Sequence, residues 1–353
     1  MVKTAVAERT NTTDTTEASE RVMWQPVHPE YHKARSVDEA IGLLGKYGTG
    51  AKIVAGGLDL VSLIKRETLP AIPSALVSIM HISGLNQIAM RGGTLSIGAL
   101  ARINDLERSP VVREYFPMLT DAAYAIGSPQ IRNMATVAGN ICQDVRCLYY
   151  RRPKGTGTDF HCHRKTPEGE CYAVCGENRE HSIFGSAECI APCVSDMAVA
   201  LTAYNARLLI KNTAGGRSMT IPELFMPLGK TLGPDELITE IIVPEPAGSV
   251  TASFHKFRIR KAIDFAIVSA AAVISTEKGI ITNVGLAVGG VASAPYYDEQ
   301  AGQYLIGKTL SKKNASEAAE ILVSKAMPME KNAYKVQITR ALVSRAILGE
   351  TEV

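Results

Sequence analysis

The stretch Ala51-Lys52-Ile53-Val54-Ala55-Gly56-Gly57-Leu58-Asp59-Leu60 decides how the fold is assigned. Its first half is mostly apolar and predicts a strand, which runs directly into a Gly-Gly turn. Residues 58–65 then predict a helix, and residues 75–79 a further strand. Glycines let a backbone approach a ligand closely and expose N–H groups to an anion, although a Gly-Gly turn is more often only a turn. The stretch therefore predicts a small α/β unit, with phosphate binding as one role for its turn.

The surrounding sequence continues this mixture of helices and strands. Ser36 is placed to cap a helix over residues 37–44, and Gly92 and Gly93 predict a hairpin turn. Residues 243–250 contain two prolines and a glycine, and they predict a linker. Further elements are expected over residues 94–97, 103–107, 117–126, 195–203, 207–211, 216–220, 253–260, 263–274, 281–288 and 315–348. The expected fold class is α+β.

A second glycine-containing region covers residues 127–140. Residues 127–133 (GSPQIRN) lead into residues 135–140 (ATVAGN), which offer small side chains, N–H groups and the polar groups of Thr136 and Asn140. Neither this region nor the first Gly-Gly turn is a G-x-G-x-x-G or a P-loop motif. Nucleotide binding by those two folds is therefore not indicated.

Composition restricts the class of protein. The chain has 353 residues, of which 46% are hydrophobic and 21% charged, and its net charge is +3. The length and composition indicate a globular protein of more than one domain, and the low net charge indicates no basic nucleic-acid surface. Residues 1–21 are polar and rich in Thr and Glu, so they predict a flexible extension rather than a secretory signal. The longest apolar run, residues 265–274, is too short to span a bilayer. We expect a cytoplasmic protein with neither a membrane span nor a nucleic-acid partner.

All seven cysteines lie between Cys142 and Cys193, in a segment rich in Arg, His, Gly and Glu that we interpret as a long functional loop. A disulfide framework would need an oxidising compartment, so metal ligation is the better interpretation. The spacing matches neither ferredoxins nor paired CxxC knuckles, and it leaves iron–sulfur and zinc equally open, with unligated thiols less favoured. Zinc would take mixed ligands from the histidines of this segment, which are His161, His163 and His181.

A charged strand is expected near the start of the C-terminal region. Alternation over residues 254–261 places Lys256, Arg258 and Arg260 on one face. That face is suited to an anionic cofactor, but alone the pattern is better explained by a solvated sheet face. Asp196 and Asp264 have the same status, because single carboxylates are more often helix caps or surface groups.

Together these regions resemble a known family, the medium FAD-binding subunits of molybdenum hydroxylases, which include xanthine dehydrogenase, carbon monoxide dehydrogenase and aldehyde oxidoreductases. The resemblance covers nearly the whole chain after Val22, in the expected order. It is carried by residues 55–60 (AGGLDL), 97–100 (IGAL), 128–133 (SPQIRN), 138–140 (AGN), 195–198 (SDMA), 264–266 (DFA), 289–292 (GGVA) and 332–336 (NAYKV).

The resemblance implies an α+β fold and its domain boundaries. Residues 1–21 would be the extension. Residues 22–245 would form an FAD-binding domain of two α/β subdomains (22–80 and 81–245), similar to vanillyl-alcohol oxidase, with the cysteine loop at 142–193. Residues 250–353 would form a C-terminal α/β domain of the CO dehydrogenase flavoprotein type.

The resemblance also implies FAD contacts. Backbone N–H groups of residues 53–60 and 136–140 would wrap the pyrophosphate, Asp196 would meet the ribose or ribityl region, and Lys256 would lie near the flavin ring. Leu58 stands where a Thr or Gln is often found, which removes one side-chain hydrogen bond to FAD. No catalytic residue is implied, and the implied cofactor contacts are Ile53, Val54, Ala55, Gly56, Gly57, Leu58, Asp59, Leu60, Ser128, Thr136, Ala138, Gly139, Asn140, Asp196 and Lys256.

The cysteine segment departs from most family members and is similar to the insertion of 4-hydroxybenzoyl-CoA reductase and of a bacterial aldehyde oxidoreductase subgroup. There the loop carries one 4Fe–4S cluster. Carried over, the ligands are Cys147, Cys162, Cys171 and Cys189, while Cys142, Cys175 and Cys193 stand outside this quartet. The choice between Cys189 and Cys193 for the fourth ligand stays open.

The implied function is electron transfer by an FAD- and 4Fe–4S-containing subunit of a molybdenum-dependent hydroxylase, dehydrogenase or aryl-CoA reductase. The implied partners are a molybdopterin-binding large subunit and a 2Fe–2S small subunit, in a heterotrimer or a dimer of heterotrimers, and an external carrier such as NAD or ferredoxin. Two alternatives remain open: a self-contained flavin oxidoreductase, and a non-enzymatic interaction module stapled by zinc.

Overall fold

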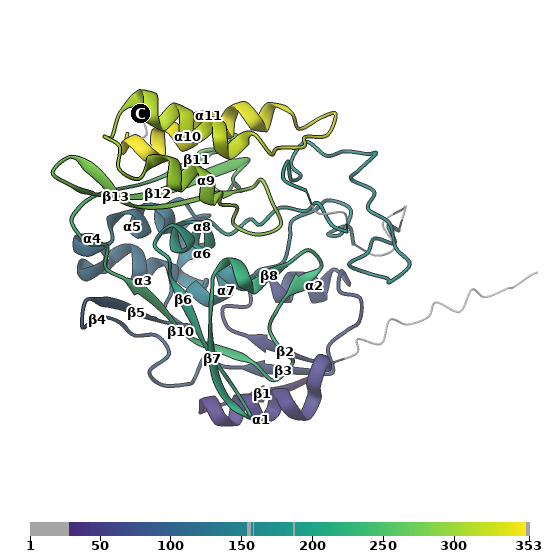
Figure 1. Ribbon diagram of the computed structural model, residues 1–353. Helices are drawn as coiled ribbons and strands as arrows, with labels where there is room; N and C mark the ends of the chain where they lie inside the picture. The colour runs from purple at the N-terminus through teal and green to yellow at the C-terminus, as the bar shows by residue number, and fades with distance from the viewer. Residues whose placement is uncertain (1–27, 154–156, 158, 186–187, 351–353) are drawn as a thin grey trace, which may run out of the picture.

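The computed structural model describes residues 28–153, 157, 159–185 and 188–350, so the predicted extension at residues 1–21 lies outside the described residues. Two larger sheets and the helices that cover them lie above a small sheet at the N-terminal end (Figure 1). The secondary structure contains both helices and strands, and the predicted α+β fold class is confirmed.

The first unit is a three-stranded parallel sheet in the order β1-β3-β2. Its helix α1 packs Ala40, Ile41 and Leu44 against the sheet, and the Ser36 hydroxyl accepts the Glu39 N–H at 3.1 Å, which confirms the predicted cap. Strand β2 ends at Val54 and leads into the Gly-Gly turn. The elements of this unit are β1 Glu30–Lys33, α1 Val37–Tyr47, η1 Gly48–Gly50, β2 Ala51–Val54, α2 Leu60–Lys65 and β3 Ala75–Ser78.

The second unit is a five-stranded antiparallel sheet in the order β4-β5-β10-β6-β7. Gly92 and Gly93 join β4 to β5 with φ angles of 57° and 74°, a left-handed pair that favours glycine and confirms the predicted hairpin. Strand β10 returns from far along the chain to pair with both β5 and β6. The bounds are β4 Ile88–Arg91, β5 Thr94–Gly98, β6 Arg207–Asn212, β7 Gly215–Thr220 and β10 Leu237–Pro244, beside a small pair, β8 Phe225–Met226 and β9 Gly229–Lys230, and the turn η2 Pro222–Leu224.

Short helices lie between this sheet and the C-terminal one (Figure 1). Helix α8 is buried along its whole length, and a Cβ at Gly285 of the C-terminal sheet would lie 1.8 Å from the Ala203 carbonyl oxygen, so the glycine is needed for this close packing. The helices are α3 Ile103–Arg108, α4 Pro110–Tyr115, α5 Pro117–Tyr124, α6 Pro129–Met134, α7 Val137–Cys142 and α8 Asp196–Ala203.

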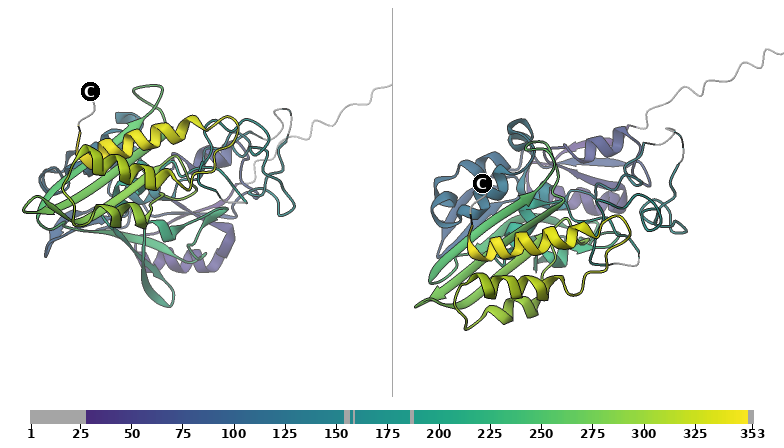
Figure 2. Two further views of the ribbon diagram at one scale, coloured as in Figure 1. Left: turned by 45° about the horizontal axis from the view of Figure 1, so that its top comes forward. Right: turned by 90° about the horizontal axis from the view of Figure 1, so that it is seen from above.

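The C-terminal unit is an antiparallel sheet, β11-β12-β13, with three helices on its outer face (Figure 2). Strand β12 is buried on both faces: Ala270, Ala272 and Ile274 pack toward the outer helices, while Ala271 and Val273 pack toward α5 and α8. This explains why its sequence is continuously apolar rather than alternating. The bounds are β11 Ser249–Phe257, β12 Val268–Glu277, β13 Ile280–Gly289, α9 Glu299–Leu305, α10 Lys312–Val323 and α11 Tyr334–Leu348.

Several predicted boundaries are wrong. The predicted linker at 243–250 shrinks to residues 245–248, because β10 extends to Pro244 and β11 begins at Ser249. The predicted strand 253–260 ends instead at Phe257, so Arg258 and Arg260 lie beyond it. Residues 263–267, expected within a core element, precede β12. Helices α4, α6 and α7, of six residues each, were not predicted.

The cysteine loop, predicted at residues 142–193, extends in the structure over residues 143–195 between α7 and α8, and its described residues form neither helix nor strand. It projects at the side of the molecule, to the right in Figure 1. Backbone hydrogen bonds attach it to the C-terminal unit: Ile183 and Phe184 donate to the Val291 carbonyl, and Cys193 donates to Ala292. Within the described ranges, no helix is both long and apolar enough for a bilayer crossing.

Candidate functional site

The glycine loop, residues 55–59, connects β2 to α2. Gly57 has a φ of 72°, a conformation that favours glycine. A Cβ at Gly56 would lie 2.0 Å from the Met134 carbonyl oxygen, so the loop passes with its backbone against the end of α6. Among the described residues, the N–H groups of Gly56, Gly57 and Leu58 have no hydrogen-bond acceptor. Three successive backbone donors without an acceptor are available to hydrogen-bond an anion such as a phosphate.

The second predicted region meets the glycine loop but uses its donors differently. Ser128 caps α6 by accepting the Ile131 N–H, and Thr136 caps α7 by accepting the Gly139 N–H at 3.2 Å. The Ala138 N–H donates to the Ala99 carbonyl, and the Asn140 N–H to the Thr136 carbonyl. These backbone donors are therefore bonded within the chain, whereas those of the glycine loop are not, and the role predicted for them stays a prediction.

Asp196 and Lys256 lie together between α8 and β11. Their charged atoms are 2.6 Å apart, with 5% and 3% of the side chains exposed, and the Lys256 ammonium also donates to the Ala125 carbonyl at 3.0 Å. Burial raises the pKa of the Asp196 carboxyl, and the Lys256 charge opposes that rise. The pair joins α8 to strand β11 of the C-terminal unit, and contacts with a ribityl chain or flavin ring stay predictions for both residues. The interpretation of Asp196 as a surface carboxylate is wrong, because its side chain is buried in the ion pair with Lys256.

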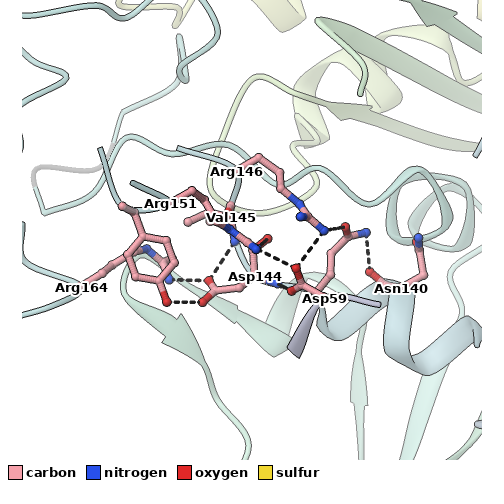
Figure 3. A network of polar contacts seen from close by, with 9 residues as sticks. Asp59, Asn140, Asp144, Val145, Arg146, Arg151 and Arg164 are labelled. Carbon is pink, nitrogen blue, oxygen red and sulfur yellow. Dashed lines mark hydrogen bonds and ion pairs between the residues drawn. The ribbon is translucent and has the colours of Figure 1, made fainter. Parts of the chain in front are cut away.

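The carboxylate of Asp59, at the end of the glycine loop, anchors the cysteine loop (Figure 3). One oxygen lies 2.9 Å from terminal nitrogens of both Arg146 and Arg151, and the other accepts the Asp144 N–H at 2.8 Å. Arg151 also donates to the carbonyls of Asp144 and Val145. A residue predicted only from the flavin motif therefore fixes the start of the neighbouring loop.

The network continues from Asp144 into the cysteine loop (Figure 3). The Asp144 carboxylate accepts the Val145 N–H at 2.8 Å, the Tyr150 hydroxyl at 2.7 Å and an Arg164 guanidinium nitrogen at 2.9 Å. Arg164 in turn donates through Nε to the Cys189 sulfur at 3.3 Å. Hydrogen bonds thus run without a break from the glycine loop to one of the predicted cluster ligands.

Four cysteines line one cavity in the cysteine loop. They are Cys147, Cys162, Cys171 and Cys189, the quartet implied by the family resemblance. The same cavity is lined by Tyr149, Tyr150, His163, Arg164, Tyr172, Ala173, His181, Glu188 and Ala191. The fold therefore brings cysteines up to 42 sequence positions apart, from 147 to 189, around one cavity.

The other three cysteines lie elsewhere. Cys193 lines a different cavity, together with Ser195 and Lys230, and Cys142 packs into the core next to α8. Cys175 is exposed. The structure therefore separates Cys189 from Cys193, the two residues between which the sequence left the choice open.

The cavity cysteines are in a poorly solvated setting. Burial raises the pKa of the Cys147 thiol to about 11, and it also raises that of Cys162. His181, whose Nε2 lies 3.3 Å from the Cys147 sulfur, has its pKa lowered to about 4 by burial. In the described part of the chain, no three His, Cys, Asp or Glu side chains converge closely enough to share a single metal ion. Buried thiols with a raised pKa are poor nucleophiles, so Cys147 and Cys162 are not placed as reactive redox sensors.

Two residues of the C-terminal unit hold the loop, and the sequence indicated no role for either beyond the motif that contains them. Lys335 is fully buried, and its ammonium donates to the carbonyls of Glu180, His181 and Gly290 at 3.0, 3.0 and 2.6 Å. Asn332 donates to the carbonyls of His181 and Ser182. The one sequence signal for either residue was its place in the stretch 332–336 (NAYKV) of the family resemblance, because the burial of Lys335 is visible only in the structure.

Two family models cover most of the chain. Residues 25–246 match the FAD binding domain in molybdopterin dehydrogenase, and residues 252–349 match the CO dehydrogenase flavoprotein C-terminal domain. Among curated proteins, the aldehyde oxidoreductase FAD-binding subunit PaoB of Escherichia coli is 34% identical over 85% of this chain and 91% of its own length. The carbon monoxide dehydrogenase medium chain of Hydrogenophaga pseudoflava is 28% identical over 91% of this chain and 96% of its own length.

Solved structures show the same similarity. A carbon monoxide dehydrogenase from Hydrogenophaga pseudoflava, which lacks the Mo-pyranopterin moiety of its cofactor, superposes with a TM-score of 0.73 at 26% identity. The superposition covers 92% of this chain and 98% of that one. The chain therefore has the fold of that dehydrogenase chain over most of its length.

Proposed function

Because the chain belongs to the family of FAD-binding subunits of molybdenum hydroxylase-type dehydrogenases, and is thus an oxidoreductase subunit, we propose that it transfers electrons between FAD and a 4Fe–4S cluster held in its cysteine loop. The observation that carries the proposal is the convergence of Cys147, Cys162, Cys171 and Cys189 on one cavity. The chemistry supplied by the bound groups would be electron exchange in pairs or singly at FAD and singly at the cluster.

The residues present fit an FAD pyrophosphate at the glycine loop. The N–H groups of Gly56, Gly57 and Leu58 have no acceptor in the described chain, and no side chain fits at Gly56. Contacts from Ile53 to Leu60, from Ser128 and Thr136 to Asn140, and from Asp196 and Lys256 are part of the proposal. The task of these residues is to bind and orient the cofactor, since we assign none of them a catalytic role.

We favour a 4Fe–4S cluster over a zinc ion in this cavity. A tetrahedral zinc with bonds to sulfur of about 2.3 Å needs thiolates about 3.8 Å apart, so its ligands converge on one point. In a 4Fe–4S cluster each cysteine binds a different iron, and the sulfurs stand farther apart around a larger group. The four cysteines that line the cavity are the same four that the family resemblance implies as ligands of a 4Fe–4S cluster, and this match supports the cluster. We assign the fourth ligand to Cys189 because Cys193 lines another cavity.

The partners follow from the family. We propose that the chain assembles with a molybdopterin-binding large subunit and a 2Fe–2S small subunit, and that an external carrier such as NAD or ferredoxin exchanges electrons with the complex. We also propose that its domains divide at residues 245–248, where the chain turns from β10 into β11. A non-enzymatic module is no longer an alternative, because the relatives are oxidoreductase subunits.

A matched pair of variants tests the cluster. Cys171→Ala removes a proposed ligand, whereas Cys175→Ala removes an exposed cysteine only four positions away that does not line the cavity. Each variant is purified anaerobically with its partner subunits and analysed for FAD, iron, zinc and acid-labile sulfide. We expect Cys171→Ala to lose iron and sulfide while FAD stays, and Cys175→Ala to match the wild type. Zinc in place of sulfide, or equal iron in both variants, would contradict the proposal.

A further inference from the structure

We propose that Arg164 is a positioning residue that sets the reduction potential of the proposed cluster through its hydrogen bond to Cys189; the inference rests on the proposed function. Its side chain is only 8% exposed, and each guanidinium nitrogen has a partner. Nε donates to the Cys189 sulfur at 3.3 Å, one terminal nitrogen to Asp144 at 2.9 Å and the other to the Pro227 carbonyl at 2.8 Å.

The geometry fixes the guanidinium in place. The two terminal nitrogens of the planar guanidinium donate to Asp144 and to the Pro227 carbonyl, so the Nε–H points at the Cys189 sulfur (Figure 3 shows the Asp144 contact). A lysine cannot reproduce this arrangement, because it is a point charge on a flexible stem rather than a rigid fork. The N–H to sulfur contact is therefore a built feature of the loop rather than a chance approach of a surface side chain.

The expected effect on a cluster has a definite sign. An electron added to a cluster increases the negative charge on its sulfur ligands, so a donor to one of them stabilises the reduced state. The guanidinium charge acts in the same direction because it lies in a poorly solvated site. Removing Arg164 should therefore make the reduction potential more negative.

Asp144 supplies a test with the opposite sign. Its carboxylate lies 2.9 Å from the Arg164 guanidinium and offsets that charge. Replacing Asp144 by Asn keeps a side chain that can still accept a hydrogen bond from the guanidinium, but it leaves the positive charge uncompensated. The Asp144→Asn potential should consequently shift to a less negative value, and this reversal would not follow from a general loosening of the loop.

The experiment is an anaerobic redox titration of the purified complex, followed by the EPR signal of the reduced cluster. We expect Arg164→Lys and Arg164→Gln to shift the reduction equilibrium at least tenfold toward the oxidised state, about 59 mV for a one-electron couple. Asp144→Asn should shift it the other way. The control is Arg179→Gln, in the same loop, where Arg179 is 68% exposed and pairs with Glu177; its potential should equal that of the wild type.

A second measurement needs no variant. Pulsed EPR on wild-type complex labelled with ¹⁵N-arginine should show a nitrogen coupling to the reduced cluster, which covers the case in which Arg164 variants lose their iron. Unshifted potentials in iron-replete Arg164 variants, or no coupling in the labelled wild type, would overturn the inference and leave the proposed function standing. A wild type that contains FAD but no iron or sulfide would overturn both.

Discussion

The glycine loop and the cysteine loop lie side by side yet are held in place by different means. The glycine loop connects β2 to α2 and owes its shape to backbone geometry at Gly56 and Gly57. The described residues of the cysteine loop have no regular structure, and side chains hold them: Asp59 at one end and Lys335 at the other. One region is positioned by secondary structure, and the other by charged groups that reach across the fold.

This difference predicts which kind of substitution destabilises each loop. A loop shaped by its backbone is sensitive to added atoms, because a new Cβ has nowhere to go. A loop held by side chains is sensitive to removed atoms, because its buried carbonyls then lose their donors. Substitutions of each kind can break or sharpen the comparison.

The largest expected effect is at Lys335, the internal anchor of the cysteine loop. Lys335→Met keeps the length of the side chain but leaves the carbonyls of Glu180, His181 and Gly290 without this donor. We expect a loss of about 3–5 kcal/mol in the free energy of unfolding, and weaker retention of iron. Chemical denaturation and iron analysis measure the two effects. The exposed Lys331→Met is the control, and equal losses in both variants would show that Lys335 has no special role.

The next effect is at Gly56. Gly56→Ala places a Cβ about where the Met134 carbonyl oxygen lies, so the loop must move. We expect about 1–3 kcal/mol of destabilisation and a clear loss of bound FAD, while iron is retained. Gly42→Ala in α1 is the matched control: its Cβ meets nothing within 4 Å, so the helix should be as stable or more stable. FAD retained at the wild-type level in Gly56→Ala would contradict the account of this loop.

The smallest effect is expected where the two regions meet. Asp59→Asn keeps an acceptor for the Asp144 N–H but removes the charge that faces Arg146 and Arg151. We expect a loss of about 1–2 kcal/mol in the free energy of unfolding, with faster hydrogen exchange at residues 144–151. Protection unchanged in that segment would show that the arginines do not depend on Asp59.

The sequence predicted the parts of the molecule that local rules determine. Helix α1 follows from the Ser36 cap and its apolar face, and the β4–β5 hairpin from two adjacent glycines. Helices α6 and α7 were missed because the Gly, Ser, Pro and Asn residues of the segment 127–140 are typical of turns. The start of β12 was placed early because residues 263–267 share its apolar composition but not its pairing.

The candidate site likewise contains residues that the sequence predicted and residues that only the structure identified. The glycine loop and the cysteine quartet could be named from the family resemblance, and the quartet converges on one cavity. Arg164 and Lys335 could not be assigned from sequence, because their partners are far along the chain. Arg164 donates to Cys189, 25 positions away, and Lys335 donates to Glu180, 155 positions away. Contacts of that range depend on the packing of the whole fold, which local patterns do not contain.

The most direct test that this chain holds both an FAD site and a cluster site compares the FAD and iron content of the wild-type complex with that of the Cys162→Ala complex. This variant removes a buried cysteine that lines the cavity. We predict one FAD per chain in both preparations, and four iron and four sulfide fewer per chain in the variant. A wild-type complex without flavin, or a variant with undiminished iron and sulfide, would contradict the account.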